Sequence, residues 1–344
     1  MPESLRHILE HWLTQDALVV GGFALVFFLL RAGARNERWQ RAGARLKRDR
    51  TGLIAFAIVL LYLTIGALEV FQIPTASGTR SILDLFLGGI SPEKSYSAPL
   101  ADTLLGSARH AKLNGHHLLG TDVLGKDVFA QMLKACRTAL IIGGLTSAIY
   151  VPLGALLGVL AGYFRRWVDD MIQYVYSTLA SIPEILLLVA IISATTPRWG
   201  RSLGTMAIAL GITGWVGLCR LIRGETMRQA ERPYVTAARA LGQTHAKIVV
   251  RHLLPNVMHL VLISAVLGFS NIVLAEAILS YLGVGAPVGT ASWGIMIDAG
   301  RTELGRDPLV WWNISAATAA LFGLVLSLNL LGDSLRRAFD PKQT

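Results

Sequence analysis

Two glutamates, Glu184 and Glu276, lie within long apolar stretches of the sequence, where a carboxylate is unusual. A charged side chain inside a membrane span costs about 2.5–3.5 kcal/mol on insertion scales, so such a group faces a cavity, a partner or the wet interface. Catalysis would need a second polar side chain at the same depth in the membrane. No His or Cys in another apolar stretch is placed to pair with Glu184. We therefore expect no catalytic residue in this chain. Both glutamates are candidates for lining a polar path through the membrane, with a position at the wet interface as the alternative for Glu184.

A glycine-rich segment imitates a nucleotide-binding loop. Residues 120–127 match G-x-x-x-x-G-K, but Asp127 stands where the Mg²⁺-binding Ser or Thr is required, and no strand precedes the segment. Three histidines lie nearby, His110, His116 and His117, without a Cys or a suitably spaced carboxylate to complete a metal site. We expect a solvated histidine cluster, no bound metal and no cofactor in this chain.

These residues must be positioned by membrane helices. The 344-residue chain is 53% hydrophobic and 16% charged, whereas soluble domains are about 25% charged. A bilayer is crossed by about 20 apolar residues, and six stretches are long enough: 52–70, 138–163, 171–195, 203–222, 257–282 and 311–332. A further stretch, Ala17–Leu30, has 14 residues and either crosses the bilayer or lies at its interface. The expected fold class is an all-α, polytopic membrane protein.

Basic residues orient these predicted spans. With residues 31–50 inside, the inside segments hold 20 of the 32 Lys and Arg, which is the asymmetry expected of cytoplasmic loops. The net charge of +10 therefore indicates orientation and contact with membrane lipids, and it is weak support for binding nucleic acid. Cys136 and Cys219 are too few to form a disulfide framework or a metal site. We expect an inner-membrane location with a cytoplasmic C-terminus.

The second apolar stretch carries a glycine pattern. Gly154, Gly158 and Gly162 form two overlapping G-x-x-x-G steps, a face on which two helices pack backbone to backbone in lipid. Pro152 and Pro183 leave carbonyl groups unpaired, which is tolerated where a neighbour or a cavity supplies partners. We expect the glycine face to contact protein.

A basic, mostly polar segment at 223–256 interrupts the apolar sequence. Pro233 suits the first turn of a helix, and Gly242 suits a left-handed C-cap. Between them one apolar face follows the i, i+3, i+4, i+7 pattern: Tyr234, Ala237, Ala238 and Leu241. A second amphipathic turn is expected to stop at Pro255. The pattern predicts a helix–turn–helix whose small residues let the backbone of another protein come close.

Several motifs resemble one family. The order Thr236-Ala237-Ala238, Gly242 and Leu254-Pro255 resembles the EAA loop of binding-protein-dependent ABC transporter permeases. Three more segments resemble the dipeptide, oligopeptide and nickel permeases: LLGTDVLGKD (118–127), LAEAILSYLGVG followed by SWG-x-M (274–296), and NLLGDSLRRAFDP (329–341). The departures are Thr236 for the glutamate that names the loop, His252 for an isoleucine and Lys126 for an arginine.

The resemblance implies a permease subunit with six spans of the type I ABC importer fold, to which Ala17–Leu30 adds an extra N-terminal hydrophobic helix. It implies two ATPase subunits that bind ATP and Mg²⁺, a second homologous permease subunit and a periplasmic solute-binding protein. It also assigns the ATPase-coupling contact to one loop: Tyr234, Thr236, Ala237, Ala238, Gly242, Leu254 and Pro255. A stand-alone secondary transporter would need inverted repeats, and the chain has no self-similar halves.

The expected organisation has four regions. Residues 1–50 form an N-terminal extension, 51–137 the first core span and a long periplasmic loop, 138–332 the transmembrane core with its coupling loop, and 333–344 a cytoplasmic tail. The solute expected from the resemblance is a di- or oligopeptide, with nickel or another small solute left open.

Overall fold

The computed structural model describes residues 37–75, 78–87, 92–105 and 112–340. The predicted extra helix Ala17–Leu30 lies outside these residues. Within them the fold is helical, as predicted, apart from one antiparallel hairpin of strands β1 (Gln72–Thr75) and β2 (Gly78–Ser81). Five helical segments are long and apolar enough to cross a membrane, and a bent helix pair makes a sixth if it counts as one span. The all-α, multi-span prediction is confirmed.

The spans follow one another along the chain in the predicted order. They are α4 (Arg50–Val70), α6 (Val128–Phe164), the pair α7 (Arg166–Ala180) and α8 (Glu184–Trp199), α9 (Leu203–Thr213) with α10 (Trp215–Ala230), α13 (Leu254–Tyr281) and α15 (Trp312–Phe339). Shorter helices connect or flank them: α3 (Glu37–Leu46), α5 (Ile82–Phe86), α11 (Pro233–Ala240), α12 (His245–Ile248), the π-helical turn η1 (Val249–Leu253) and α14 (Trp293–Glu303).

The third predicted span is not one straight helix. α7 and α8 meet at 86°, with Ser181 and Pro183 in the break. A proline disfavours helical backbone at the residue before it and lacks the N–H that would continue the ladder. Consequently Glu184 begins α8, with its side chain exposed, instead of lying inside a continuous span.

Helix ends also extend beyond the apolar stretches. α6 begins at Val128 rather than 138 because Asp127 caps it, its Oδ1 accepting from the Ala130 N–H at 2.7 Å. α10 continues to Ala230 and α15 to Phe339, past the predicted limits of 222 and 332. Hydropathy marks the part of a helix that contacts lipid, whereas capping and charged turns decide where the helix ends.

The bundle is built around the close pair α6 and α10. A Cβ added at Gly158 would meet the Cys219 carbonyl oxygen at 2.8 Å, and one added at Gly162 would meet that of Arg223 at 2.6 Å. Gly154 faces the Trp215 carbonyl oxygen in the same way, at 3.0 Å. The glycine face therefore packs on another helix of the same chain, backbone against backbone.

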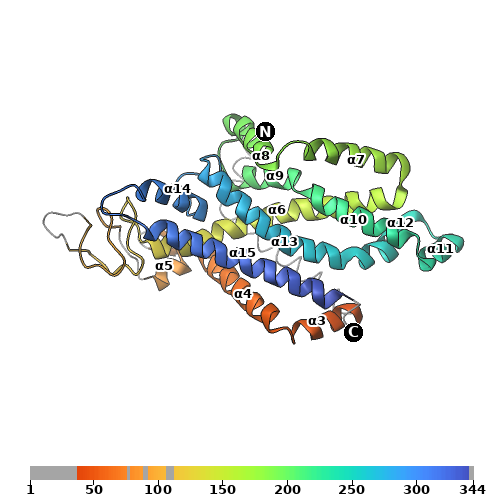
Figure 1. Ribbon diagram of the computed structural model, residues 1–344, viewed down its shortest axis with the longest axis horizontal. Coiled ribbons are helices and arrows are strands. Elements are labelled where there is room, and N and C mark those ends of the chain that lie inside the picture. Colours follow the sequence, from red (N-terminus) through yellow and green to blue (C-terminus); the bar gives the residue numbers. More distant parts are fainter. Residues whose placement is uncertain (1–36, 76–77, 88–91, 106–111, 341–344) are drawn as a thin grey trace.

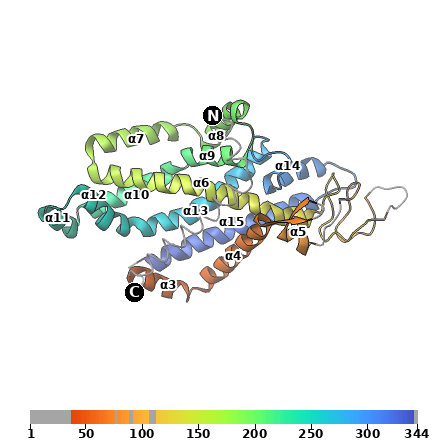
Figure 2. The ribbon, with the colours of Figure 1, turned by 180° about the vertical axis from the view of Figure 1, so that it is seen from behind.

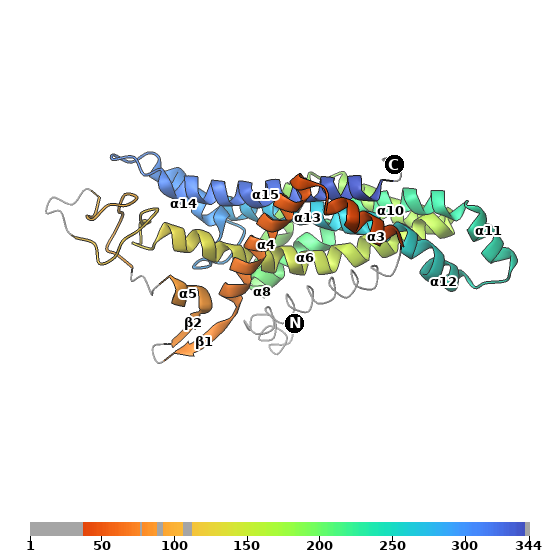
Figure 3. The same ribbon diagram turned by 90° about the horizontal axis from the view of Figure 1, so that it is seen from below.

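The molecule is elongated, and its two ends differ (Figures 1 and 2). At one end α11 and α12 project beyond the bundle. At the other end lie α14 and the irregular segments 92–105 and 112–127, which together we call the cap. The β1–β2 hairpin stands out beside the end of α4 (Figure 3). α3 lies against the last turns of α15, where Trp39 packs edge-on to Phe339 with ring centres 5.1 Å apart.

Candidate functional site

The projecting end consists of α11 and α12, residues 233–248, which we call the coupling hairpin. Pro233 is in the first turn of α11, as predicted. Gly242 has φ of 71° and ends the helix. The Gln243 N–H donates to the Ala238 carbonyl oxygen at 3.1 Å, and the Gly242 N–H donates to that of Arg239 at 2.9 Å. These two bonds form a Schellman motif, which fixes the corner between the two helices.

The predicted apolar face of the hairpin, Tyr234, Ala237, Ala238 and Leu241, is mostly exposed, and only Ala238 of the four is buried. Val235 and Ala238 are buried against Ile248 and Leu253, whereas Leu241 is 80% exposed. Tyr234, Thr236 and Ala237 are exposed as well. Helical periodicity grouped Leu241 with Ala238 on one face, but it could not show that Leu241 is exposed while Ala238 is buried. The corner therefore presents Ala237, Leu241 and Gly242, while Ala238 belongs to the hairpin's own core.

The second half of the loop does not stop at Pro255. The helix widens into the π-helical turn η1 and continues into α13, in which Pro255 occupies the first turn and is exposed, with Leu254 half-buried before it. Pro255 has no N–H to donate to the carbonyl group one turn earlier. The wider π-helical turn just before it lets the helix continue despite this missing hydrogen bond. The hairpin is thus joined directly to a membrane span.

Contacts with α6 anchor the hairpin. The Tyr163 hydroxyl lies 2.7 Å from Nδ1 of His245, and the guanidinium carbon of Arg239 lies 5.0 Å from the centre of the Tyr163 ring. Thr236, which replaces the glutamate of the motif, donates to the Pro233 carbonyl oxygen at 2.9 Å. The Thr236 hydroxyl is hydrogen-bonded within α11. Threonine also has no carboxylate with which to contact a partner.

Glu276 is placed in the packed interior of the bundle. Its side chain is 1% exposed, and Oε1 accepts hydrogen bonds from the hydroxyls of Ser280 and Ser292, each at 2.7 Å. The same serines accept from the Ala286 and Gly294 N–H groups. Glu276 therefore holds the turn between α13 and α14. The two candidate path residues are not brought together, because Glu184 is at the exposed start of α8.

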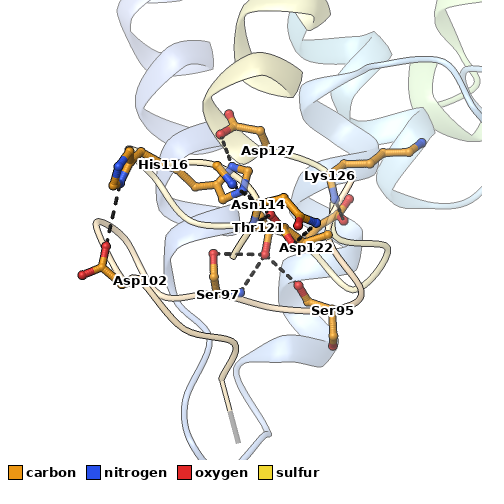
Figure 4. Close-up of polar contacts among 12 residues, drawn as sticks. Ser95, Ser97, Asp102, Asn114, His116, Thr121, Asp122, Lys126 and Asp127 are labelled. Atoms are coloured by element: carbon orange, nitrogen blue, oxygen red, sulfur yellow. Dashed lines mark hydrogen bonds and ion pairs between the residues drawn. The ribbon is translucent and has the colours of Figure 1, made fainter. Parts of the chain in front are cut away.

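The cap contains a buried histidine that the sequence did not predict. His116 is 96% exposed and lies 3.8 Å from Asp102, as a solvated histidine would. His117 instead has a fully buried side chain, with Nδ1 2.8 Å from Asp127 and Nε2 3.5 Å from Glu93. The third histidine, His110, lies outside the described residues. Figure 4 shows Asp127 above this cluster, at the start of α6.

Gly120 and Gly125, the two glycines of the segment that matches G-x-x-x-x-G-K, have structural roles. Both have φ of 71°, and a Cβ would meet a carbonyl oxygen at 2.3 Å at Gly120 and at 1.9 Å at Gly125. Between them Asp122 Oδ1 accepts from the Leu124 and Lys126 N–H groups at 2.8 and 2.9 Å (Figure 4). The segment is a tight turn closed on its own side chains.

A second polar cluster joins the cap to α14 and α15. The Tyr96 hydroxyl and the Asn313 amide each donate to Glu303, both at 3.2 Å. Burial raises the pKa of the Glu303 carboxyl, and these two hydrogen bonds oppose the shift. The Trp312 indole donates to the Thr121 carbonyl oxygen at 3.0 Å. Among the described residues, no group of three or more His, Cys, Asp or Glu could hold a metal ion.

These features define a polytopic helical membrane protein with a structured cap at one end and a rigid helical hairpin at the other. Residues 154–344 match the family model of the binding-protein-dependent transport system inner membrane component. The chain belongs to this family. It is the membrane component of an ABC importer, a transport subunit and not an enzyme.

Two similar proteins are permeases of peptide transport systems. The chain is 28% identical over 304 residues to the dipeptide transport system permease DppC of Alkalihalophilus pseudofirmus, covering 88% of this chain and 90% of that protein. It is 31% identical to the oligopeptide permease OppC of Bacillus subtilis, covering 66% and 72%. A chain of the inward-facing MetNI methionine ABC transporter superposes with a TM-score of 0.48 at 22% identity, covering 62% of this chain and 96% of that one.

Proposed function

We propose that this chain is one of two permease subunits of an ABC importer that carries di- or oligopeptides across the inner membrane. The peptide class is inferred from relatives, which include a di/tripeptide permease of Pseudomonas aeruginosa at 35% identity and a glutathione permease of Pectobacterium atrosepticum at 32%. The energy comes from ATP hydrolysis on two partner ATPase subunits, which bind the ATP and Mg²⁺.

The observation that carries the proposal is the coupling hairpin. Its corner projects from the bundle (Figure 1). The exposed residues there include Ala237, Leu241 and Gly242. Nothing lies within 4 Å of a Cβ added at Gly242, and Leu241 is 80% exposed. Because the residues at the corner have small side chains, its backbone can come close to a groove on a protein partner. Leu241 can then be buried in that groove as an apolar anchor, which makes the contact specific.

The transport cycle follows from how the hairpin is attached. ATP binding draws the two ATPase subunits together, and the hairpin docked on them is displaced as one unit, because the Schellman motif fixes its corner and Tyr163 ties it to α6. α10 and α13 continue directly from the two sides of the hairpin, so their tilt opens the path to the outside. Hydrolysis reverses the tilt. This is alternating access, in which each bound partner shifts the population of two states.

The cap is the proposed docking surface for the solute-binding protein. Leu118, Val123 and Leu124 are 57%, 49% and 63% exposed on a segment outside the spans. Apolar side chains gathered on a water-facing surface are typical of a protein contact. We infer that the hairpin and the C-terminus lie in the cytoplasm and the cap on the outer side, because Lys and Arg are concentrated in the segments on the hairpin's side of the spans.

Reconstitution tests the function. The chain is co-purified with its partner permease and ATPase subunits, placed in liposomes and supplied with the solute-binding protein and a labelled dipeptide. We expect uptake that requires both ATP and the binding protein, and competition by other small peptides. Uptake of Ni²⁺ without any peptide uptake would replace the peptide assignment. ATP-independent accumulation would contradict the importer mechanism itself.

A further inference from the structure

α7 is attached to the bundle by apolar packing of Ile172 and Leu179 and by two residues that contact arginines. It lies along one side of the molecule (Figures 1 and 2) and exposes large apolar side chains, including Trp167 and Tyr174 at 73% and 72%. The residues it buries are Asp169 and Tyr176. Both of them contact arginines of α10.

The first contact is a bidentate ion pair between Arg223 and Asp169. Nε of Arg223 lies 2.5 Å from Oδ1 of Asp169, and Nη2 of Arg223 lies 2.7 Å from Oδ2. The side chains are 23% and 9% exposed, respectively. Paired N–H donors on a carboxylate fix orientation as well as distance, which a single point contact does not. The pair therefore fixes the angle between α7 and α10.

Two further contacts act in the same place. The guanidinium carbon of Arg220 lies 4.7 Å from the centre of the Tyr176 ring, within the range of a cation–π interaction. In the turn from α6 to α7, Arg165 donates to Glu231 at 2.7 Å. Arg165 and Arg166 both have positive φ, at 54° and 52°, so this turn is strained and depends on its contacts.

The arginines that hold α7 lie on the helix that leads into the coupling hairpin. Arg220 and Arg223 are three residues apart on α10, so they share one face. α10 ends at Ala230, and α11 begins at Pro233. At its other end α7 stops at the 86° break, beyond which Glu184 begins α8. The hairpin is thus connected to Glu184 in three steps. The chain joins the hairpin to α10, side-chain contacts join α10 to α7, and the chain joins α7 to α8.

We propose that Asp169 and Arg223 are a positioning pair that transmits movement of the coupling hairpin from α10 to α7, and so reorients the start of α8. The inference rests on the proposed function, because it concerns how that transport cycle is driven. The pair needs no contact with solute or ATP for this role. Its role is to make α7 move as one body with α10 when the hairpin is displaced.

Charge exchange tests this inference in the complete transporter. Asp169→Asn keeps the shape of the side chain and removes its charge, and Arg223→Asp reverses the cation. Each is expected to lower ATP-driven uptake by about tenfold, the scale of a typical coupling between sites, while ATP hydrolysis and assembly persist. The double variant Asp169→Arg with Arg223→Asp is expected to restore most of the uptake. Arg228→Glu is the matched control, because Arg228 pairs with Glu225 on α10 itself.

A second measurement does not depend on transport. Spin labels at Tyr174 of α7 and Lys247 of the hairpin, both exposed, report the distance between these elements in the purified complex. We expect one narrow distance distribution that shifts with nucleotide in the unaltered protein and a broad one in Asp169→Asn.

The outcomes separate the two proposals. Normal uptake by Asp169→Asn together with an unchanged distance distribution would overturn the positioning role while leaving the importer function intact. Failure of the charge-exchanged pair to restore uptake, despite normal assembly, would overturn it as well. Absence of ATP-driven uptake in the unaltered protein would instead count against the importer function, and the distance measurement would still decide whether the pair joins α7 to α10.

Discussion

The Ser292 hydroxyl donates a hydrogen bond to Oε1 of Glu276 over 2.7 Å, which joins the start of α14 to the last turns of α13. The two residues belong to separate sequence motifs, AEAILSYLGVG and SWG. The structure shows why both are present. A Cβ at Gly294 would meet the Ala277 carbonyl oxygen at 2.5 Å, so the SWG turn rests directly on the helix that carries Glu276.

The first prediction concerns this carboxyl. Glu276→Leu removes the acceptor of two buried hydroxyls, and we expect it to lower the free energy of unfolding by about 1–3 kcal/mol, the cost of unsatisfied buried donors. Glu276→Gln keeps an acceptor oxygen and should cost less. Thermal unfolding in detergent distinguishes the two. Equal stability of the Leu and Gln variants would show that the hydrogen bonds contribute little.

The second prediction concerns the corner of the hairpin. We expect Gly242→Glu to leave the protein in the membrane but to abolish solute-stimulated ATP hydrolysis, because a charged side chain would lift the corner from its groove. Gly283→Glu is the matched control, since Gly283 also has positive φ and open space but lies beyond the other end of α13. Both variants carry backbone strain of about 1–2 kcal/mol. Wild-type coupling in Gly242→Glu would remove the hairpin from the coupling mechanism.

The third prediction concerns Glu184. If its carboxylate faces the transport path, Glu184→Gln should change uptake of cationic relative to anionic peptides while assembly stays intact. If it pairs with a cation of the second permease, the same change should weaken the heterodimer, since stranding a buried charge costs about 3–5 kcal/mol. Asp170→Asn, an exposed carboxylate at the start of α7, is the control. No effect in either assay would place Glu184 at the wet interface.

The fourth prediction concerns acid stability at the α4–α15 contact. A hydrogen bond from Arg337 to Asp49, at 3.0 Å, lowers the pKa of the Asp49 carboxyl to about 2. An unfolded Asp titrates near pH 3.9, so the contribution of Asp49 to stability is fully present above about pH 4 and is lost as the pH falls through about 2. Asp49→Asn should reduce the pH dependence of unfolding in this window. Asp298→Asn, whose partner Arg301 lies on its own helix, is the control; an equal reduction in both variants would contradict the assignment.

The fifth prediction concerns topology. In a variant with Cys136 and Cys219 replaced, a cysteine at Leu118 of the cap should react with a membrane-impermeant thiol reagent on spheroplasts. One at Lys247 of the hairpin should react only after permeabilisation. A cysteine at Ser4 tests the predicted extra span, because labelling from outside requires Ala17–Leu30 to cross the membrane. Labelling of Lys247 from outside would invert the proposed orientation.

Hydropathy and motif order were sufficient to predict the fold class and the position of the hairpin, because lipid contact and helix caps depend on local sequence. They were not sufficient for contacts between distant residues. Asp169 and Arg223 are 54 residues apart, and neither stands out in its own segment. Ala238 was assigned to the exposed corner because alanine is compatible with both faces of a helix. The burial of His117 depends on Glu93, which approaches it from a separate part of the cap.

The glycine face of α6 has a mechanical consequence. Because carbonyl oxygens of α10 rest directly on Gly154, Gly158 and Gly162, the two helices cannot slide past one another without collision and must turn together. At 37 residues α6 is about 55 Å long, and it reaches from Asp127 of the cap to Tyr163 beneath the hairpin. If α6 tilts as a rigid rod, its two ends move in opposite directions, and a tilt of about 5° about its midpoint displaces each end by about 2 Å. Such a tilt would carry a displacement of the hairpin to the cap with no chemical relay between them.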